Sequence, residues 1–214
     1  MRLLAVGGLL LSSASTAIAA SCSNCSLTSQ DPKVLQYAWA IQRLSSWFYE
    51  TNSANQTNFS SAPNISISTA YYPDNLQGIQ AQNLLGAAQV QSLASNLSDF
   101  QQPDCNFSMP TPSTITQYLA KSWYLETVIS GAFTGLANFT QTPTVSLLLS
   151  QLAVQHATHA TYIAASFLPN VFDANNISDI PVLPPDVVLS NDTHDSMLGH
   201  VLGGCVAAPE APCG

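Results

Sequence analysis

The sequence contains very few charged side chains. Asp, Glu, Lys and Arg make up 7% of its 214 residues, with 12 acidic residues against 4 Lys and Arg. In soluble domains the charged share is usually about a quarter. A chain with a formal net charge of −8 and so few cations cannot form the basic surface that binding to nucleic acid or anionic lipid requires. We therefore expect no nucleic-acid partner.

Other features are missing as well. Beyond residue 20 no apolar run is long enough for a membrane-spanning helix, which needs about 20 residues. The sequence has no Gly-x-Ser-x-Gly elbow for a nucleophilic serine and no glycine-rich phosphate loop. These absences argue against a membrane span, a serine hydrolase and a P-loop nucleotide site.

The N-terminus is typical of a secretory signal peptide. "MRLLAVGGLLLSSASTAIAA" combines one basic residue, a short apolar run and the small residues Ala17 and Ala19. We expect a signal peptide over residues 1–19, followed by an N-terminal tail over 20–30. The protein is therefore predicted to be secreted, to the extracellular space or the cell wall.

Acceptor sites for N-linked glycans agree with secretion. Nine Asn-x-Ser/Thr sequons occur without an intervening proline. Attached carbohydrate would supply the solubility that the few charges cannot. The predicted glycosylation sites are Asn24, Asn55, Asn58, Asn64, Asn96, Asn106, Asn138, Asn176 and Asn191.

The chain has five cysteines, which in an oxidising compartment indicate disulfides with one thiol left over. Cys22 and Cys25 form a Cys-x-x-Cys motif, but it lies in the expected N-terminal tail, where pairing with the other tail is favoured over redox chemistry. The pairing stays open. The disulfide candidates are Cys22, Cys25, Cys105, Cys205 and Cys213.

Four segments have the periodicity of amphipathic helices, and no set of strands is indicated. They cover residues 31–52, 73–97, 113–138 and 144–167. We expect an all-α domain over residues 31–167, followed by an extended, proline-rich and disulfide-tied tail over 168–214. Four helices of similar length predict an up-down-up-down bundle, in which all cysteine-bearing segments lie at one end.

Two histidines interrupt the apolar stripe of the fourth helix. In "LLLSQLAVQHATHATYIAASF", His156 and His159 fall on the side occupied by leucines, and Glu126 interrupts the stripe of the third helix in the same way. All three residues lie at similar distances from the turn near residue 140, so antiparallel packing brings them to one level. We expect one carboxylate and two imidazoles to meet inside the bundle.

Three segments carry a resemblance to a known family. "VLQYAWAIQRLSSWFYE", "YLAKSWYLETVISGAFTGLA" and "LLSQLAVQHATHATYIAASF" are similar to the first, third and fourth helices of secreted ferritin-like proteins of fungi. That group includes stress-responsive and late-sexual-development proteins. The resemblance covers about residues 32–167 and implies a ferritin-like bundle, whose parent fold holds two irons with Glu residues and two Glu-x-x-His pairs.

Carried over by position, the resemblance implies a degenerate di-iron site. Gln42 and Ser45 stand where the first helix should supply acids, and the second helix has Gly86 and Gln89 in place of Glu-x-x-His. The third helix keeps Glu126. The fourth helix keeps His159, and His156 replaces its Glu. With one carboxylate left, we expect no di-iron centre.

Three functions remain open. The preferred one is a non-catalytic, glycosylated extracellular or cell-wall protein without a cofactor, with a role in stress or development implied by the resemblance alone. The first alternative is an enzyme with redox or hydrolytic chemistry on a small molecule, using one divalent metal, Zn or Fe, held by Glu126, His156 and His159. Gln42, Ser45 and Gln89 would line that pocket. The second alternative is a small-molecule binding bundle. The sequence does not identify a protein partner.

Overall fold

The computed structural model of the chain describes residues 30–52, 72–168 and 198–209. The expected signal peptide, Cys22, Cys25 and Cys213 lie outside these ranges. So do six of the nine sequons, those of Asn24, Asn55, Asn58, Asn64, Asn176 and Asn191.

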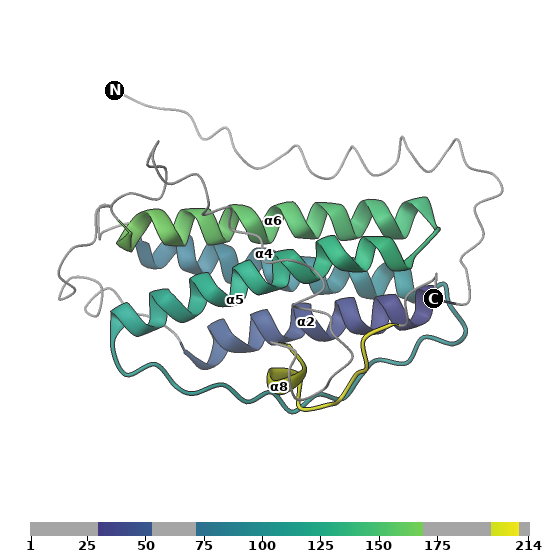
Figure 1. Cartoon of the computed structure of the whole chain (residues 1–214), viewed down its shortest axis with the longest axis horizontal. Coiled ribbons are helices and arrows are strands. Elements are labelled where there is room, and N and C mark those ends of the chain that lie inside the picture. The colour runs from purple at the N-terminus through teal and green to yellow at the C-terminus, as the bar shows by residue number, and fades with distance from the viewer. Residues whose placement is uncertain (1–29, 53–71, 169–197, 210–214) are drawn as a thin grey trace, which may run out of the picture.

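Four long helices make up the body of the molecule (Figure 1). They are α2 (Asp31–Thr51), α4 (Tyr72–Ala94), α5 (Ile115–Leu136) and α6 (Pro143–Phe167), accompanied by the short helices η1 (Ala137–Phe139) and α8 (Gly199–Leu202). No strand occurs in the described ranges. The predicted all-α four-helix class is confirmed.

Local sequence sets where three of the long helices begin. Pro32 and Pro143 lie in the first turns of α2 and α6, where a missing backbone N–H does no harm. The side chain of Thr114 accepts a hydrogen bond from the backbone N–H of Gln117 and so caps α5. Asp31 is the first residue of α2, and its buried carboxylate accepts hydrogen bonds from Thr140 and Thr142.

Helices α2 and α6 run parallel. Asp31, which begins α2, contacts Thr142, which immediately precedes α6, and further along the same helices Gln42 contacts His156. The expected order of alternating directions is therefore wrong. The bundle consists of two antiparallel hairpins, α2 with α4 and α5 with α6, and α4 and α5 point the same way (Figure 1).

The reason lies in the connection between α4 and α5. Its 20 residues, 95–114, run along the outside of the bundle from one end to the other (Figure 1). An extended chain of this length spans up to about 66 Å, whereas the 23 residues of α4 span about 35 Å. The connection is thus long enough for a crossover. Nothing in its proline-rich sequence distinguishes a crossover from a connection that stays at one end of the bundle.

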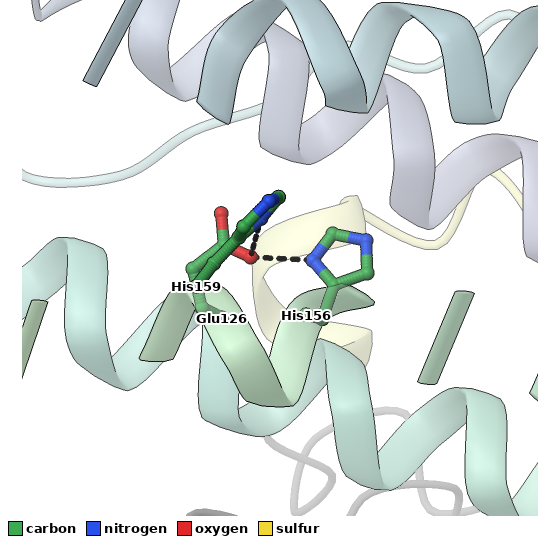
Figure 2. A group of neighbouring side chains, drawn as sticks. All are labelled: Glu126, His156 and His159. Atoms are coloured by element: carbon green, nitrogen blue, oxygen red, sulfur yellow. Dashed lines mark hydrogen bonds and ion pairs between the residues drawn. The ribbon is translucent and has the colours of Figure 1, made fainter. Parts of the chain in front are cut away.

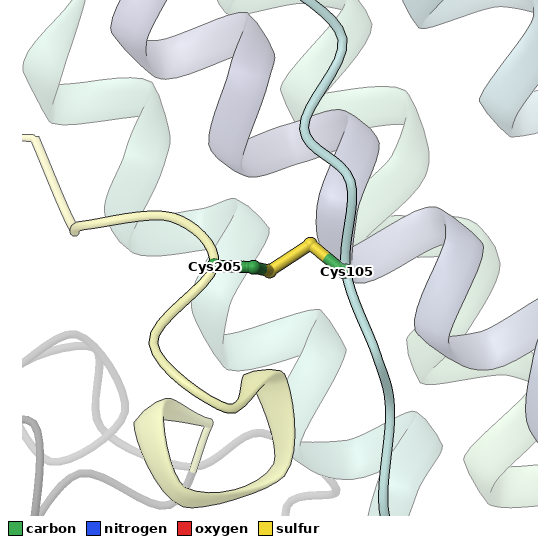
Figure 3. Close-up of a disulfide and its surroundings, with 2 residues drawn as sticks. All are labelled: Cys105 and Cys205. Carbon is green, nitrogen blue, oxygen red and sulfur yellow. A yellow bond between two sulfur atoms is a disulfide. The ribbon is translucent and has the colours of Figure 1, made fainter.

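The crossover follows α2. The ring of Phe107 lies 5.9 Å from that of Trp47 near the end of α2, while Gln101 lines a surface pocket with Lys33 near its start. Cys105, between them, forms a disulfide with Cys205 (Figure 3).

The alternating order predicted that this bond would lie at one end of the bundle. It lies instead beside the bundle, along α2 (Figure 3). It ties the segment after α8 to the crossover. Leu198, just before α8, and Leu202, its last residue, are buried in the core. A disulfide between the crossover and the C-terminal region is therefore part of the fold.

The core has a layer of polar side chains near the middle of the bundle, with large apolar side chains on both sides of it. The largest fully buried side chains are Phe48, Phe133, Leu35, Ile41, Leu44, Leu119, Ile129, Leu136, Leu149 and Leu152. Between them Gln42, Ser45, Asn83, Glu126 and His156 are 0% exposed. Among the helices in the described ranges, none is both long and apolar enough to cross a membrane.

Candidate functional site

Glu126 lies at the centre of the polar layer, where α5 faces α6. Its Oε2 atom is 2.5 Å from Nδ1 of His156 and 3.2 Å from Nδ1 of His159 (Figure 2). The two histidines are three residues apart on α6, so both rings project from one helical face toward the same carboxylate oxygen. The structure thus brings together the three residues that the sequence singled out.

The other carboxylate oxygen of Glu126 is held by α2 and α4. The hydroxyl groups of Tyr49 and Ser45 donate to Oε1 at 2.9 and 3.3 Å, and Nδ2 of Asn83 donates at 3.2 Å. Asn83 also donates to the hydroxyl oxygen of Ser45 at 2.7 Å. Both oxygens of this buried carboxylate therefore have protein partners.

The outer nitrogens of the two histidines have different partners. Nε2 of His156 lies 2.9 Å from the amide nitrogen Nε2 of Gln42. Nε2 of His159 lies 2.7 Å from the amide oxygen Oε1 of Gln82. The ring of Phe133 stacks on His156 at a centroid separation of 5.5 Å and fixes its plane.

The electrostatics of the site favour an ionised Glu126. Burial raises the pKa of this carboxyl group, since it takes the charged form out of water. His156 opposes this effect of burial through its charge and its hydrogen bond, and His159 adds a smaller contribution of the same kind. Together they hold the pKa of Glu126 well below its usual range. The pKa of Tyr49 is raised well above 10.0 by burial and by the nearby Glu126 charge, so the phenol stays a donor.

The half of the centre formed by α2 and α4 is uncharged. Ser45, Asn83 and Gln42 supply only neutral groups, and Gly86 supplies no side chain. A Cβ atom on Gly86 would lie 2.9 Å from Nε2 of Gln42, so the missing side chain makes room for that amide.

The expectation for Gln89 was wrong. This residue is exposed on α4, whereas Asn83 and Gly86 occupy the inward face three residues apart. The inward pair on α4 lies one helical turn earlier than the resemblance implies. Asn83 could have been found, because it interrupts the apolar series of Leu76, Ile79 and Val90. Gln82 could not, because an exposed glutamine carries no such signal.

The donor set does not fit a di-iron centre. A ferric pair carries about six positive charges and is held by several carboxylates in bundles of this type. In the described ranges, Glu126 is the single carboxylate among the groups that meet at the centre. The set does fit one ion, since one ligand atom each from Glu126, His156 and His159 lies within 4.8 Å of the others.

Comparison with known proteins agrees with this architecture. A family model described as ferritin-like domain matches residues 30–168, which include all four long helices and the three central residues. No curated protein matches the chain. The match spans well over half of the sequence, and the chain therefore belongs to the ferritin-like domain family.

Proposed function

We propose that this is a secreted, N-glycosylated ferritin-like protein whose bundle centre holds a hydrogen-bonded Glu–His–His cluster in place of a di-iron centre. Its role in the extracellular space or cell wall is non-catalytic. In this proposal, residues 1–19 are a cleaved signal peptide, and residues 20–30 and 168–214 are tails around the 31–167 bundle. A part in stress or development is what the resemblance to the fungal secreted group implies.

One observation carries the non-catalytic proposal: Glu126 is fully supplied with protein donors. Five groups reach its two oxygens, so a buried anion that would otherwise be costly is stabilised by protein side chains alone. The neutral residues on α2 and α4 cannot hold a second ion.

Glycosylation is supported by the exposure of the sequons in the described ranges. Asn96, Asn106 and Asn138 are all exposed. Asn96 and Asn106 lie in the crossover, Asn96 just after α4, and Asn138 lies in η1. Glycans there would cover a surface with few charges.

The test is to secrete the full chain from a eukaryotic host and analyse the product. We expect an N-terminus at residue 20 or 21, a mass that falls on treatment with peptide-N-glycosidase, and less than one equivalent of bound transition metal. A retained leader or an unchanged mass would contradict secretion or glycosylation. Two equivalents of iron would contradict the loss of the di-iron centre.

A second candidate is an enzyme with one metal on Glu126, His156 and His159. The observation that favours it is the contact between His159 and Gln82, because histidine ligands typically donate their outer N–H to an oxygen. Such an ion would act as a Lewis acid or redox centre. One equivalent of metal in the native protein, absent from His159→Ala, would replace the first proposal with this one. No specific observation favours small-molecule binding.

A further inference from the structure

Helices α4 and α6 together form a face of the bundle that carries almost no charge. Their sequences contain one charged residue, Asp74 in the first turn of α4. Helices α2 and α5, of similar length, contain six, which are Asp31, Lys33, Arg43, Glu50, Lys121 and Glu126. Neither α4 nor α6 contains a glycosylation sequon. This face therefore lacks both charge and an attachment site for carbohydrate within its two helices.

The same two helices expose large aliphatic side chains. Six large apolar residues are exposed in the described ranges, and four of them lie on α4 and α6: Leu84, Leu85, Leu147 and Val154. Leu85 and Val154 are the most exposed, at 64% and 67%. A hydrogen bond from Gln155 to Asn83 makes the two helices neighbours at this point, so Leu85 and Val154 lie at the same level of the bundle.

The described segments outside the four long helices lie on the other side of the bundle. Figure 1 shows the crossover and α8 below α2 and α5, while α6 lies along the opposite side. The crossover is fixed there by the contact between Phe107 and Trp47 and by the disulfide between Cys105 and Cys205. These segments thus leave the side formed by α4 and α6 open, which agrees with the exposure of its aliphatic side chains.

The polar side chains on this face are suited to contact an identical copy. Those exposed around the aliphatic residues include Gln89, Ser92, Gln151 and Thr158. Amide and hydroxyl groups both donate and accept hydrogen bonds, so two such faces can pair without opposing like groups. The chain has a net charge of −8, and contact through charged faces would bring like charges together. The cores of protein interfaces are likewise poor in charge.

The face is also large enough for a stable contact. Helices of 23 and 25 residues span about 35 Å, and two neighbouring helices with their side chains present a width of about 20 Å. The product is about 700 Å² for each copy, close to the roughly 800 Å² that each partner buries in a typical stable complex.

We propose that the face formed by α4 and α6 is a docking surface for a second copy of this chain, with Leu85 and Val154 near its centre. The two copies pair about a twofold axis, because only this arrangement uses the same patch on both and closes the assembly as a dimer. The inference goes beyond the proposed function and does not depend on what the centre of the bundle holds.

The first test is sedimentation equilibrium of the secreted full chain and of three arginine variants. We expect a dimer of the native chain above about 10 μM. Val154→Arg and Leu85→Arg should each raise the dimer Kd by about 100-fold or more, because every copy would bury an unpaired charge. Tyr124→Arg is the matched control, at a residue 42% exposed on α5, and should leave the Kd within about twofold.

A native chain that stays monomeric at the highest concentration would overturn the proposal. So would a dimer that survives both variants on α4 and α6, or one that the control weakens equally. Far-UV circular dichroism and urea unfolding establish that each variant keeps the helical fold, which substitutions at exposed positions should preserve.

The second test identifies what covers the face. Hydroxyl-radical footprinting compares the oxidation of Leu85, Val154 and Tyr124 in protein diluted below the dimer Kd and concentrated above it. We expect Leu85 and Val154 to be protected in the dimer only, and Tyr124 to react equally in both samples. Protection of Leu85 and Val154 already in the monomer would show that another part of the chain covers them, and would overturn the proposal.

The third test is the effect of salt on the dimer. Two copies with the same negative charge repel each other, and salt screens this repulsion. We therefore expect the dimer Kd to fall as NaCl is raised from about 50 to 500 mM. A dimer that weakens over this range would be held by ion pairs, which α4 and α6 cannot supply, and this would overturn the assignment of the contact to this face.

Discussion

The hydroxyl of Tyr49 on α2 donates a hydrogen bond to Oε1 of Glu126 on α5 over 2.9 Å, and both side chains are buried. This contact joins the first hairpin of the bundle to the second at the level of the two histidines. The phenol is thus one of the groups that donate to the buried carboxylate of Glu126.

Tyr49→Phe is therefore expected to destabilise the protein by about 1.5–3 kcal/mol, the usual contribution of a hydrogen bond to a charged group. Urea unfolding followed by circular dichroism measures the free energy of unfolding. Tyr124→Phe, at a residue 42% exposed on the same bundle, is the control and should change it by less than about 0.5 kcal/mol. Equal effects at the two positions would show that the Tyr49 hydroxyl is not used.

Glu126 and His156 should be energetically coupled. Removing one member of a buried pair costs about 3–5 kcal/mol, because the other is left without its partner. We expect Glu126→Gln and His156→Gln each to approach this cost, and the double variant to be more stable than their sum by about 0.5–3 kcal/mol.

A second cycle provides the comparison for this coupling. Asp31 is equally buried but lies at the end of the bundle, so Asp31→Asn should add to Glu126→Gln within about 0.5 kcal/mol. Additivity in both cycles would contradict a direct interaction between Glu126 and His156.

The helices and the central residues were accessible from the sequence because both depend on local spacing. Polar residues that interrupt an apolar stripe must be buried, which pointed to Glu126, His156 and His159. Helix directions were not accessible, because a 20-residue connection permits either a return at one end or a crossover. The direction depends on packing between hairpins, to which residues distant in sequence contribute.

The same limit explains the errors around the site. The second helix has few large apolar residues to define its inward face, so its sequence does not separate Gln89 from the true inward positions, Asn83 and Gly86. A connection that returned at one end of the bundle would leave Cys105 at that end, whereas the crossover carries it along α2 (Figure 1). The segment that carries Cys205 lies against the same part of α2 as the crossover, so the two cysteines can pair.

The disulfide should stabilise the protein by restricting its unfolded state. Cys105 and Cys205 are separated by 100 residues, a loop for which the loss of chain entropy is large. We expect Cys105→Ala with Cys205→Ala to lower the free energy of unfolding by about 2–4 kcal/mol. Peptide mapping without reductant should recover the linked pair from the native protein. A native protein in which either residue is alkylated as a free thiol would contradict the bond.

The contribution of Glu126 to stability should disappear in acid. Burial raises the pKa of Glu126, but His156 and His159 lower it further, so the folded pKa lies below the ordinary value of 4.5. A group whose pKa is lowered by folding stabilises the folded state fully above its unfolded pKa, and this contribution is lost as the pH falls toward the folded pKa. The stability difference between the native protein and Glu126→Gln should therefore be constant above about pH 5 and shrink below about pH 4.

Urea titrations between about pH 3 and 7 measure this difference. Glu50→Gln serves as the matched control, because Glu50 is exposed near the end of α2. Subtracting its curve removes the general effect of one lost carboxylate on net charge. If the Glu126→Gln difference instead grew as the pH fell, the folded pKa of Glu126 would have to lie above the unfolded one. The effect of burial on the pKa of Glu126 would then outweigh that of the two imidazoles. His156 and His159 could not then be the groups that keep Glu126 ionised.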